Sequence, residues 1–265
     1  MRNKYIVALV GVFVFSFSVF GQSPAKIEQE LTQHLENIEK WTMLNDRTGE
    51  DLSVALAKEH KIFRSKLLKY TKRLSTLKYG YKDLAKHMRI ATSPDGRFRI
   101  YSRDTLTGGT MHFFETVYQF QAKNGRVYSQ LSDKEEGDAG AFVLGISQLD
   151  TKIGRVYMAS SQAILSTSYR GQSLNLFRIG SRSLNSGLKL IKTKSGLTNS
   201  LGFAYDFFSV SDRKERPVRL FRFDGESRTI RFPVVIENEK FPQGEVTSRW
   251  IKYRFDGNYF VKVKS

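Results

Sequence analysis

The stretch TGGTMHFFETVYQFQ places His112 and Glu115 three positions apart among aromatic residues. On a helix the two side chains would share one face and could act as a catalytic or metal-binding pair. On a strand they would lie on opposite faces, because side chains alternate there with a period of two. β-branched and aromatic residues dominate the stretch, and two glycines typical of a turn precede it. We therefore predict a strand over residues 110–121 and treat His112 and Glu115 as separate features.

Glu115 lies between apolar residues on its predicted face, where burial would raise its pKa and suit it to general acid catalysis. The alternative is a Glu that lies at a sheet edge or forms an ion pair with an arginine of the preceding strand, for which the candidates are Arg97, Arg99 and Arg103. We favour this alternative, because charged residues are mostly exposed and, where buried, are usually paired. By similar reasoning, a single His among aromatics is more often a packed residue of the core or rim than a ligand or base.

Four acidic residues fall in the short stretch SDKEEGDAG, which we expect to be a solvated hairpin loop: Asp133, Glu135, Glu136 and Asp138. Oxygen-rich loops can bind calcium, but the spacing of the EF-hand is not met here. The chain has four His, no Cys and no HExxH motif, so it carries no zinc signature. We expect neither a metal nor a cofactor.

Motifs of nucleophilic catalysis are also missing from the sequence. The serines of SSQAILSTSYRGQS occur in neither a GxSxG nor an SxxK pattern, and we interpret them as the polar face of an exposed strand. Glycosidase chemistry needs two carboxylates that the fold brings together, which sequence spacing cannot show. The carboxylates to inspect for such a pair are Asp104, Glu115, Glu135, Glu136 and Asp138.

Two amphipathic helices are predicted before the strands. Apolar residues recur at spacings of three and four in two stripes, over residues 27–41 and 52–77. The stretch NDRTGED separates the stripes, and Gly49 within it can take the positive φ of a helix end. Gly80 is expected to end the second helix. The pattern predicts a helical hairpin region over residues 22–90.

From residue 96 the hydrophobic period changes to that of strands. Runs such as VRLFRFD, RTIRFPVVIE and RWIKYRFD alternate in polarity and are bounded by turn residues. Asp256-Gly257 separates WIKYRF from YFVKV, which is a strong hairpin signal. No long helical pattern interrupts the runs, so we predict a mainly antiparallel β domain over residues 91–265. A propeller-like meander, a barrel and a sandwich all fit this pattern.

Residues 1–21 have the pattern of a signal peptide. Arg2 and Lys4 precede an apolar run over residues 6–20, shorter than the ~20 residues that span a bilayer. We predict cleavage after Gly21 and no transmembrane span in the mature chain. Because the chain has no Cys, it has no disulfide framework and no lipoprotein anchor. These features predict an exported protein, either periplasmic or secreted.

Positive charge is concentrated in the C-terminal half of a chain whose formal net charge is +17. Residues 151–265 hold 21 Lys and Arg against nine Asp and Glu, whereas residues 22–150 hold 20 against 17. This asymmetry suggests an anionic partner, and outside the cytoplasm we expect an envelope polymer or lipid surface rather than nucleic acid. The alternative is that the charge serves only solubility. The candidate binding residues come from a segment without acids: Arg155, Arg170, Arg178, Arg182, Lys189, Lys192 and Lys194.

Three runs resemble uncharacterised exported proteins of Bacteroidota: SPDGRFRIYSRDTLTGGTMHFFETVYQFQ, QLDTKIGRVYMASSQAILSTSYRGQSLNLFRI and YRFDGNYFVKV. The resemblance covers most of the β region and less of the helical hairpin. It implies export from a Gram-negative cell, and it implies no activity, cofactor or catalytic residue.

Two hypotheses for the function follow. The first is a non-enzymatic binding or envelope-associated protein whose basic β domain engages an anionic envelope glycan, a lipid or an acidic protein. It predicts binding that weakens steeply as salt is added. The second is a glycan-acting hydrolase, which requires two carboxylates that converge in a cleft. We favour the first, since no catalytic signature is present.

Overall fold

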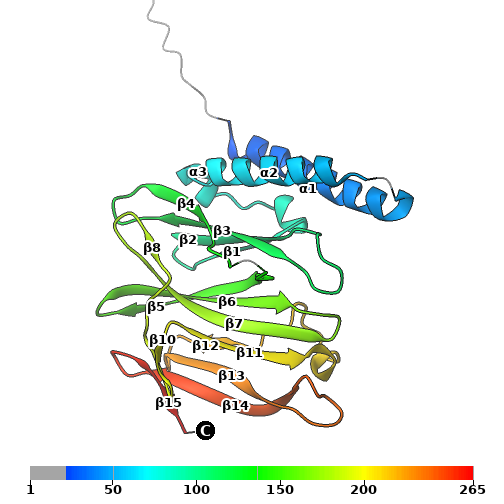
Figure 1. The fold of residues 1–265 in the computed structure, drawn as a ribbon. Helices are drawn as coiled ribbons and strands as arrows, with labels where there is room; N and C mark the ends of the chain where they lie inside the picture. The colour runs from blue at the N-terminus through cyan, green and yellow to red at the C-terminus, as the bar shows by residue number, and fades with distance from the viewer. Residues whose placement is uncertain (1–21, 50, 136, 265) are drawn as a thin grey trace, which may run out of the picture.

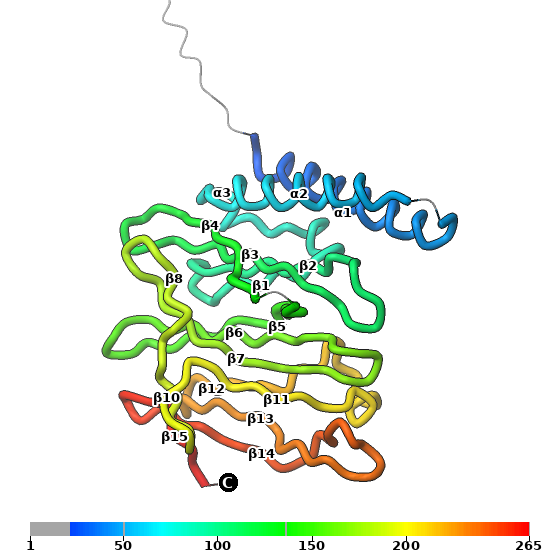
Figure 2. The backbone as a smooth tube through the Cα atoms, viewed as in Figure 1, coloured from blue at the N-terminus to red at the C-terminus, as the bar shows by residue number. Residues whose placement is uncertain are grey.

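The structure is a computed structural model that describes residues 22–49, 51–135 and 137–264 (Figures 1 and 2). The predicted signal peptide, residues 1–21, lies outside the described residues, as does Glu136. Within the described residues, every helix falls short of the length or the apolar character that a membrane crossing requires.

The described residues begin with the predicted helical hairpin, formed by α1 (Pro24–Thr48) and α2 (Ser53–Tyr70). The Ser23 side chain caps the start of α1 by accepting a hydrogen bond from the backbone N–H of Lys26. Gly49 ends α1 with a φ of 67°, which confirms the positive φ expected there. Most of the first predicted stripe is buried: Ile27, Leu31, Leu35 and Ile38.

The second helix ends earlier than predicted. It stops at Tyr70 rather than near Gly80, and a separate turn, α3 (Leu74–Leu77), follows it. Thr71 marks the break, because its hydroxyl donates to the Leu67 carbonyl oxygen at 2.6 Å and lies 2.6 Å from the Ser129 hydroxyl of the adjoining sheet. The apolar spacing continues across the break because both segments pack on the same surface, so periodicity alone did not reveal it. A short 3₁₀ helix, η1 (Leu84–Lys86), leads into the strands.

Three sheets follow. The first contains, in spatial order, β1 (Arg89–Thr92), β2 (Phe98–Asp104), β3 (Phe114–Gln121) and β4 (Val127–Leu131). The second contains β11 (Ser200–Asp206), β7 (Tyr169–Ile179), β6 (Gly154–Ile164) and β5 (Phe142–Thr151), with β8 (Leu184–Asn185) paired to β7. The third contains β10 (Gly196–Thr198), β9 (Ile191–Thr193), β15 (Phe260–Val263), β14 (Glu245–Phe255), β13 (Thr229–Ile236) and β12 (Arg222–Asp224). A second 3₁₀ helix, η2 (Phe207–Val210), follows β11.

The helices and the three sheets stack as successive layers, with the helices above the first sheet in Figure 1. One core joins α1 and α2 to the first sheet through Tyr101 and Val117. A second core joins the first and second sheets around Phe98 and Phe177, and a third joins the second and third sheets around Leu176. Among the residues that the structure describes, all strand pairs are antiparallel except that of β15 with β9. The prediction of a mainly antiparallel β protein with an N-terminal helical hairpin is therefore confirmed, and the stacked sheets are closest to the sandwich alternative.

Candidate functional site

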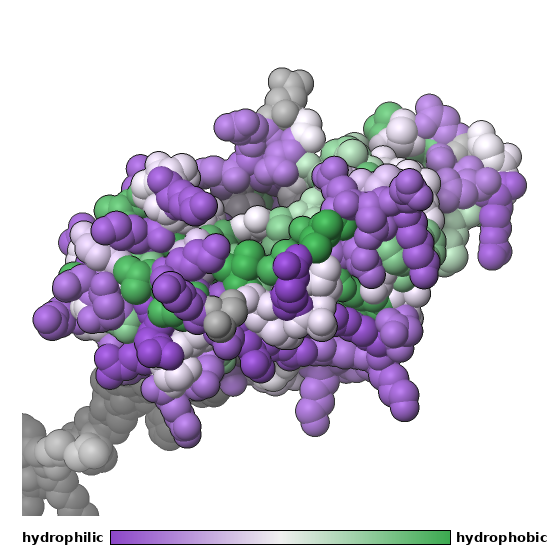
Figure 3. Space-filling view, turned by 90° about the horizontal axis from the view of Figure 1, so that it is seen from below, coloured by the Kyte–Doolittle hydropathy of each residue, from purple (hydrophilic) through white to green (hydrophobic). Residues whose placement is uncertain are grey.

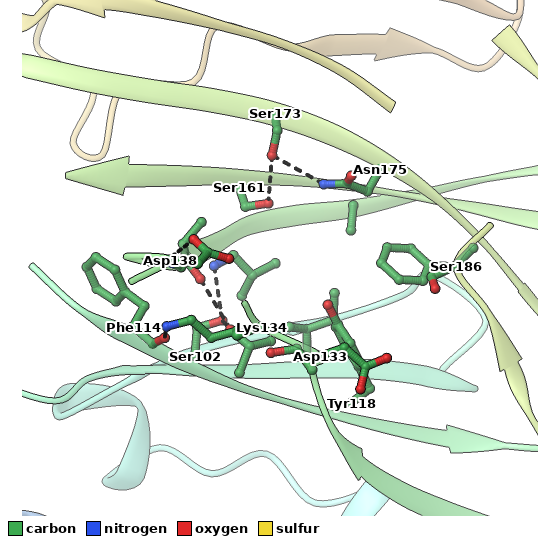
Figure 4. A pocket seen from close by; sticks show the side chains of 18 of the residues that line it. Ser102, Phe114, Tyr118, Asp133, Lys134, Asp138, Ser161, Ser173, Asn175 and Ser186 are labelled. Carbon is green, nitrogen blue, oxygen red and sulfur yellow. Dashed lines mark hydrogen bonds between the residues drawn. The ribbon is translucent and has the colours of Figure 1, made fainter. Parts of the chain in front are cut away.

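A cleft of about 470 Å³ opens between the first and second sheets (Figure 4). This volume lies in the usual range for small-molecule and cofactor sites. The cleft is lined by strands β2, β3 and β4 on one side and by β5, β6 and β7 on the other. The loop between β4 and β5 and the connections after β8 and before β11 complete the lining. Its uncharged polar lining residues are Ser102, Thr116, Gln130, Ser132, Ser161, Ser173, Asn175, Ser186 and Asn199.

Strand register explains why the hydroxyls meet in this cleft. Ser102 pairs with Thr116 across β2 and β3, and Ser161 pairs with Ser173 across β6 and β7. Directly paired residues share a face of the sheet, so each pair points into the cleft together. The hydroxyls lie 3.2 Å apart in the first pair and 3.4 Å apart in the second, and Asn175 donates to Ser173 at 3.2 Å.

Aromatic side chains lie beside the polar groups. Tyr118 and Phe177 line the cleft with ring centroids 5.4 Å apart, and they pack on the core that closes the space between the two sheets. Phe114 lines another part of the cleft and packs on Phe142 at 5.2 Å. Burial and the nearby charge of Asp133 raise the pKa of Tyr118 to about 12, so its hydroxyl stays protonated and can donate at neutral pH.

The loop between β4 and β5 places charged groups at the cleft. Lys134 donates from Nζ to the Phe114 carbonyl oxygen at 2.9 Å, and Asp138 accepts from the Gly140 backbone N–H at 2.8 Å. Gly140 has a φ of 70°, and a Cβ there would lie 2.5 Å from the Phe114 carbonyl oxygen, so only glycine fits. The loop is thus held against β3, with Asp133 and Asp138 both lining the cleft.

Glu115 lies on the opposite face of the first sheet from the cleft. Its carboxylate accepts hydrogen bonds from Arg103 Nη2 at 2.9 Å and Nε at 3.1 Å, and it also pairs with Arg64 of α2. The side chain of Arg103 is only 2 % exposed, and its Nη1 donates to Nδ1 of His60 at 2.8 Å. The predicted ion pair with a preceding-strand arginine is confirmed, and Glu115 joins the helices to the sheet.

His60 is held neutral by this cluster. Burial lowers its pKa to about 4, and the neighbouring charge of Arg103 acts in the same direction. An unfolded His titrates near 6.5, so the folded chain binds fewer protons between pH 6.5 and 4, and stability is lost as the pH falls through that window. Between pH 7 and 5 we expect His60 to contribute about 1 kcal/mol of this loss, less than the full pKa shift would give, because solvent partly screens the half-buried imidazole. Urea unfolding at pH 7 and at pH 5 tests this expectation. Between these pH values His60→Asn should lose less stability than the wild type, and an equal loss would contradict the role given to His60.

His112 lies in the loop before β3 rather than in the strand, which starts at Phe114, four residues later than predicted. Its Nδ1 lies 2.5 Å from the carboxylate of Asp104, and its ring stacks near Phe114 at 6.3 Å. Thus His112 and Glu115 are separate features, as predicted. Asp104, Glu115 and Glu135 do not line the cleft, so Asp138 is the one lining residue among the four inspected carboxylates that the structure describes; Glu136 lies outside the described residues.

The seven predicted basic residues do not form one surface. Arg155 and Arg178 line one small pocket, whereas Arg170 lies over the Phe207 ring at 5.3 Å. The remaining four are exposed, one in strand β9 and three in the loops between β7 and β10: Lys192, and Arg182, Lys189 and Lys194.

Sequence reasoning missed the cleft residues of the second sheet. Ser161 was assigned to an exposed strand face, but that face is covered by the first sheet. The available signal was the alternation of small or polar residues along these strands, as in Ser161, Ala163, Ser173 and Asn175. Small side chains on one strand face leave space where a second sheet packs over them, but the pattern does not say which sheet packs there.

No family model, curated protein or solved structure matches this chain. Within residues 22–49, 51–135 and 137–264, no three His, Asp or Glu side chains converge as metal ligands would. The site is therefore interpreted from its own geometry. Uncharged donors and acceptors beside aromatic faces can bind a hydroxyl-rich ligand by hydrogen bonds and ring contacts.

Proposed function

We propose that this chain is an exported, non-enzymatic binding protein that takes a glycan of the cell envelope in the cleft between its first and second sheets. The observation that carries the proposal is the lining of that cleft, which combines hydroxyl and amide side chains with the aromatic faces of Phe114, Tyr118 and Phe177. Sugars present hydroxyls at their edges and apolar C–H faces, so they match both kinds of surface.

The cleft is also pre-organised. Ser173 contacts both Ser161 and Asn175, and Thr116 donates to the Ala141 carbonyl oxygen at 3.2 Å. Each of these groups keeps unused hydrogen-bonding capacity, because a hydroxyl has two acceptor sites and an amide has two donors. Groups that are already ordered lose little entropy when a ligand binds.

The basic side chains on the outer face of the third sheet support the prediction of a negatively charged partner. Arg222, Arg231 and Lys252 are opposite one another across β12, β13 and β14, and Arg254 and Lys192 flank Val261 of β15 in the next row. The alternate residues of β13 and β14 face the core, so these five basic side chains lie on the side away from it. Seen from the side of β14 and β15, the surface is largely hydrophilic with a central apolar strip (Figure 3).

Retention on envelope material tests the proposal. Residues 22–265 are incubated separately with peptidoglycan sacculi and with outer-membrane vesicles, then pelleted at low and at high salt. We expect retention on one of them that weakens as salt is added, because the charges on the exposed sheet face are screened. The pellet fraction is compared with that of the variant Arg231→Gln/Lys252→Gln, which should show a smaller salt effect. No retention on either material would contradict an envelope partner.

A glycan-acting hydrolase is a second candidate, favoured by one observation. Asp133 and Asp138 both line the cleft, from a single loop at one side of it. Hydrolysis normally uses two carboxylates that flank the scissile bond, and the opposite wall, formed by β6 and β7, contributes hydroxyls and an amide instead. Release of new reducing ends during the incubation with sacculi would favour the hydrolase over the binding protein.

A further inference from the structure

Four basic side chains from both halves of the chain surround a second, smaller cavity. It measures about 120 Å³ and is lined by Arg97, Lys123, Arg155 and Arg178, together with Tyr157. Arg97 and Lys123 come from the turns that join β1 to β2 and β3 to β4. Arg155 and Tyr157 come from the start of β6, and Arg178 comes from the end of β7. Phe177 lines the cleft and Ile179 lines this cavity, and both belong to the core between the first two sheets. The two sites are therefore separate.

The positive charge of this cavity is only partly neutralised within the described residues. The carboxylates that contact the four side chains are Asp95 and Asp150, and both are used by Arg155, at 2.9 Å and 2.7 Å. Lys123 makes no side-chain hydrogen bond or ion pair among the residues that the structure describes. Arg178 makes one long contact, from Nη1 to the Ile153 carbonyl oxygen at 3.4 Å.

Arg97 places a guanidinium at the cavity and holds it there. Its Nη2 donates to the carbonyl oxygens of Gln121 and Ala122 at 3.2 and 3.3 Å, which fixes the guanidinium beside the cavity. Its Nε is buried and has no hydrogen-bond partner. A buried donor without a partner costs free energy comparable to a lost hydrogen bond, and the guanidinium that carries this donor lines the cavity.

We propose that this basic pocket binds a phosphate or sulfate group. Arginine guanidinium groups hold such oxyanions with paired N–H donors, and lysine adds a point charge. The cavity is well above the roughly 10–15 Å³ that one water molecule requires, so a tetrahedral oxyanion has room to enter. The group is either a free anion or the charged substituent of a larger molecule, because the pocket lies among surface turns.

Isothermal titration calorimetry of residues 22–265 tests the pocket with three probes at constant ionic strength: inorganic phosphate, inorganic sulfate and a hexose phosphate. The variant Lys123→Gln/Arg178→Gln removes two charges at the pocket without breaking an ion pair. Its matched control, Lys58→Gln/Lys61→Gln, removes two exposed charges from α2. We expect the pocket variant to bind at least about tenfold more weakly and the control to bind as the wild type does.

The possible outcomes distinguish binding in the pocket from attraction by the overall positive charge of the protein. They also identify the source of the anion. Tighter binding of hexose phosphate than of phosphate would indicate a phosphorylated larger molecule, and equal binding would indicate a free anion. No binding of any probe by the wild type would overturn the proposal, as would unchanged affinity in the pocket variant or equal weakening in the α2 control. Thermal unfolding of each variant confirms that it is folded.

Discussion

Replacing Glu115 with Gln is expected to lower the free energy of unfolding by about 3 kcal/mol, within the range for breaking a buried ion pair. The carboxylate side chain is 12 % exposed and it neutralises Arg103, which is 2 % exposed. Glu115→Gln leaves this guanidinium buried without a counter-charge, and it also removes the contact to Arg64 that ties α2 to the first sheet. Urea unfolding at pH 7 measures the change.

Two further variants separate charge from packing. Arg103→Met/Glu115→Leu removes both charges and should be more stable than Glu115→Gln, because no unpaired charge remains. Asp83→Asn breaks the exposed pair between Asp83 and Lys86, and we expect no measurable change from it. A Glu115→Gln protein that unfolds within about 0.5 kcal/mol of the wild type would show that the cluster does not hold the helices on the sheet.

Removing polar groups from the cleft is expected to weaken glycan binding by roughly 10- to 100-fold. Ser161→Ala/Asn175→Ala deletes two groups that would each form a hydrogen bond worth about 0.5–1.5 kcal/mol. Both side chains bond only to Ser173 among the residues described, so the fold should be retained. Calorimetry with a soluble oligosaccharide that binds the wild type measures the loss.

The matched control makes the same chemical changes elsewhere. Ser195→Ala/Asn258→Ala alters exposed turns of the third sheet, and its affinity for the oligosaccharide should equal that of the wild type. Equal affinity in the cleft variant and the control would place the binding site outside the cleft. Loss of affinity in both would indicate that the changes act through stability rather than through contact.

Local patterns predicted the parts of this structure that depend on neighbouring residues. Alternation along β3 correctly separated Glu115, which faces α2, from Thr116 and Tyr118, which face the cleft. The positive φ of Gly49 and the hairpin at Asp256-Gly257 followed from turn chemistry. These features need only a strand or helix period and a turn residue.

Features that depend on stacking could not be predicted in this way. The cleft forms because Thr116 of β3 and Ser173 of β7 belong to sheets that pack face to face, and nothing in their own strands specifies that contact. The segment without acidic residues also suggested a single basic surface, which the structure does not form. Arg170 and Arg178 lie at opposite parts of β7, about 26 Å apart at the usual rise per residue, so strand direction separates charges that are close in sequence.

The pocket around Arg97 and Lys123 shows the reverse effect. Both residues belong to the half of the chain with little net charge, and the stacking of turns places them beside Arg155 and Arg178. Counting charge along the sequence assigns the positive character to one half, whereas the structure builds this pocket of four basic side chains from both halves.

Hydrogen–deuterium exchange with and without soluble oligosaccharides released from sacculi tests the central claim most directly. If the cleft binds the glycan, exchange should slow in β3, in β7 and in the loop over residues 132–141, and it should be unchanged in β14 and β15. The variant Ser161→Ala/Asn175→Ala should lose this protection. Protection confined to the third sheet, or no change in exchange at the cleft under conditions where the oligosaccharide binds, would contradict the proposed function.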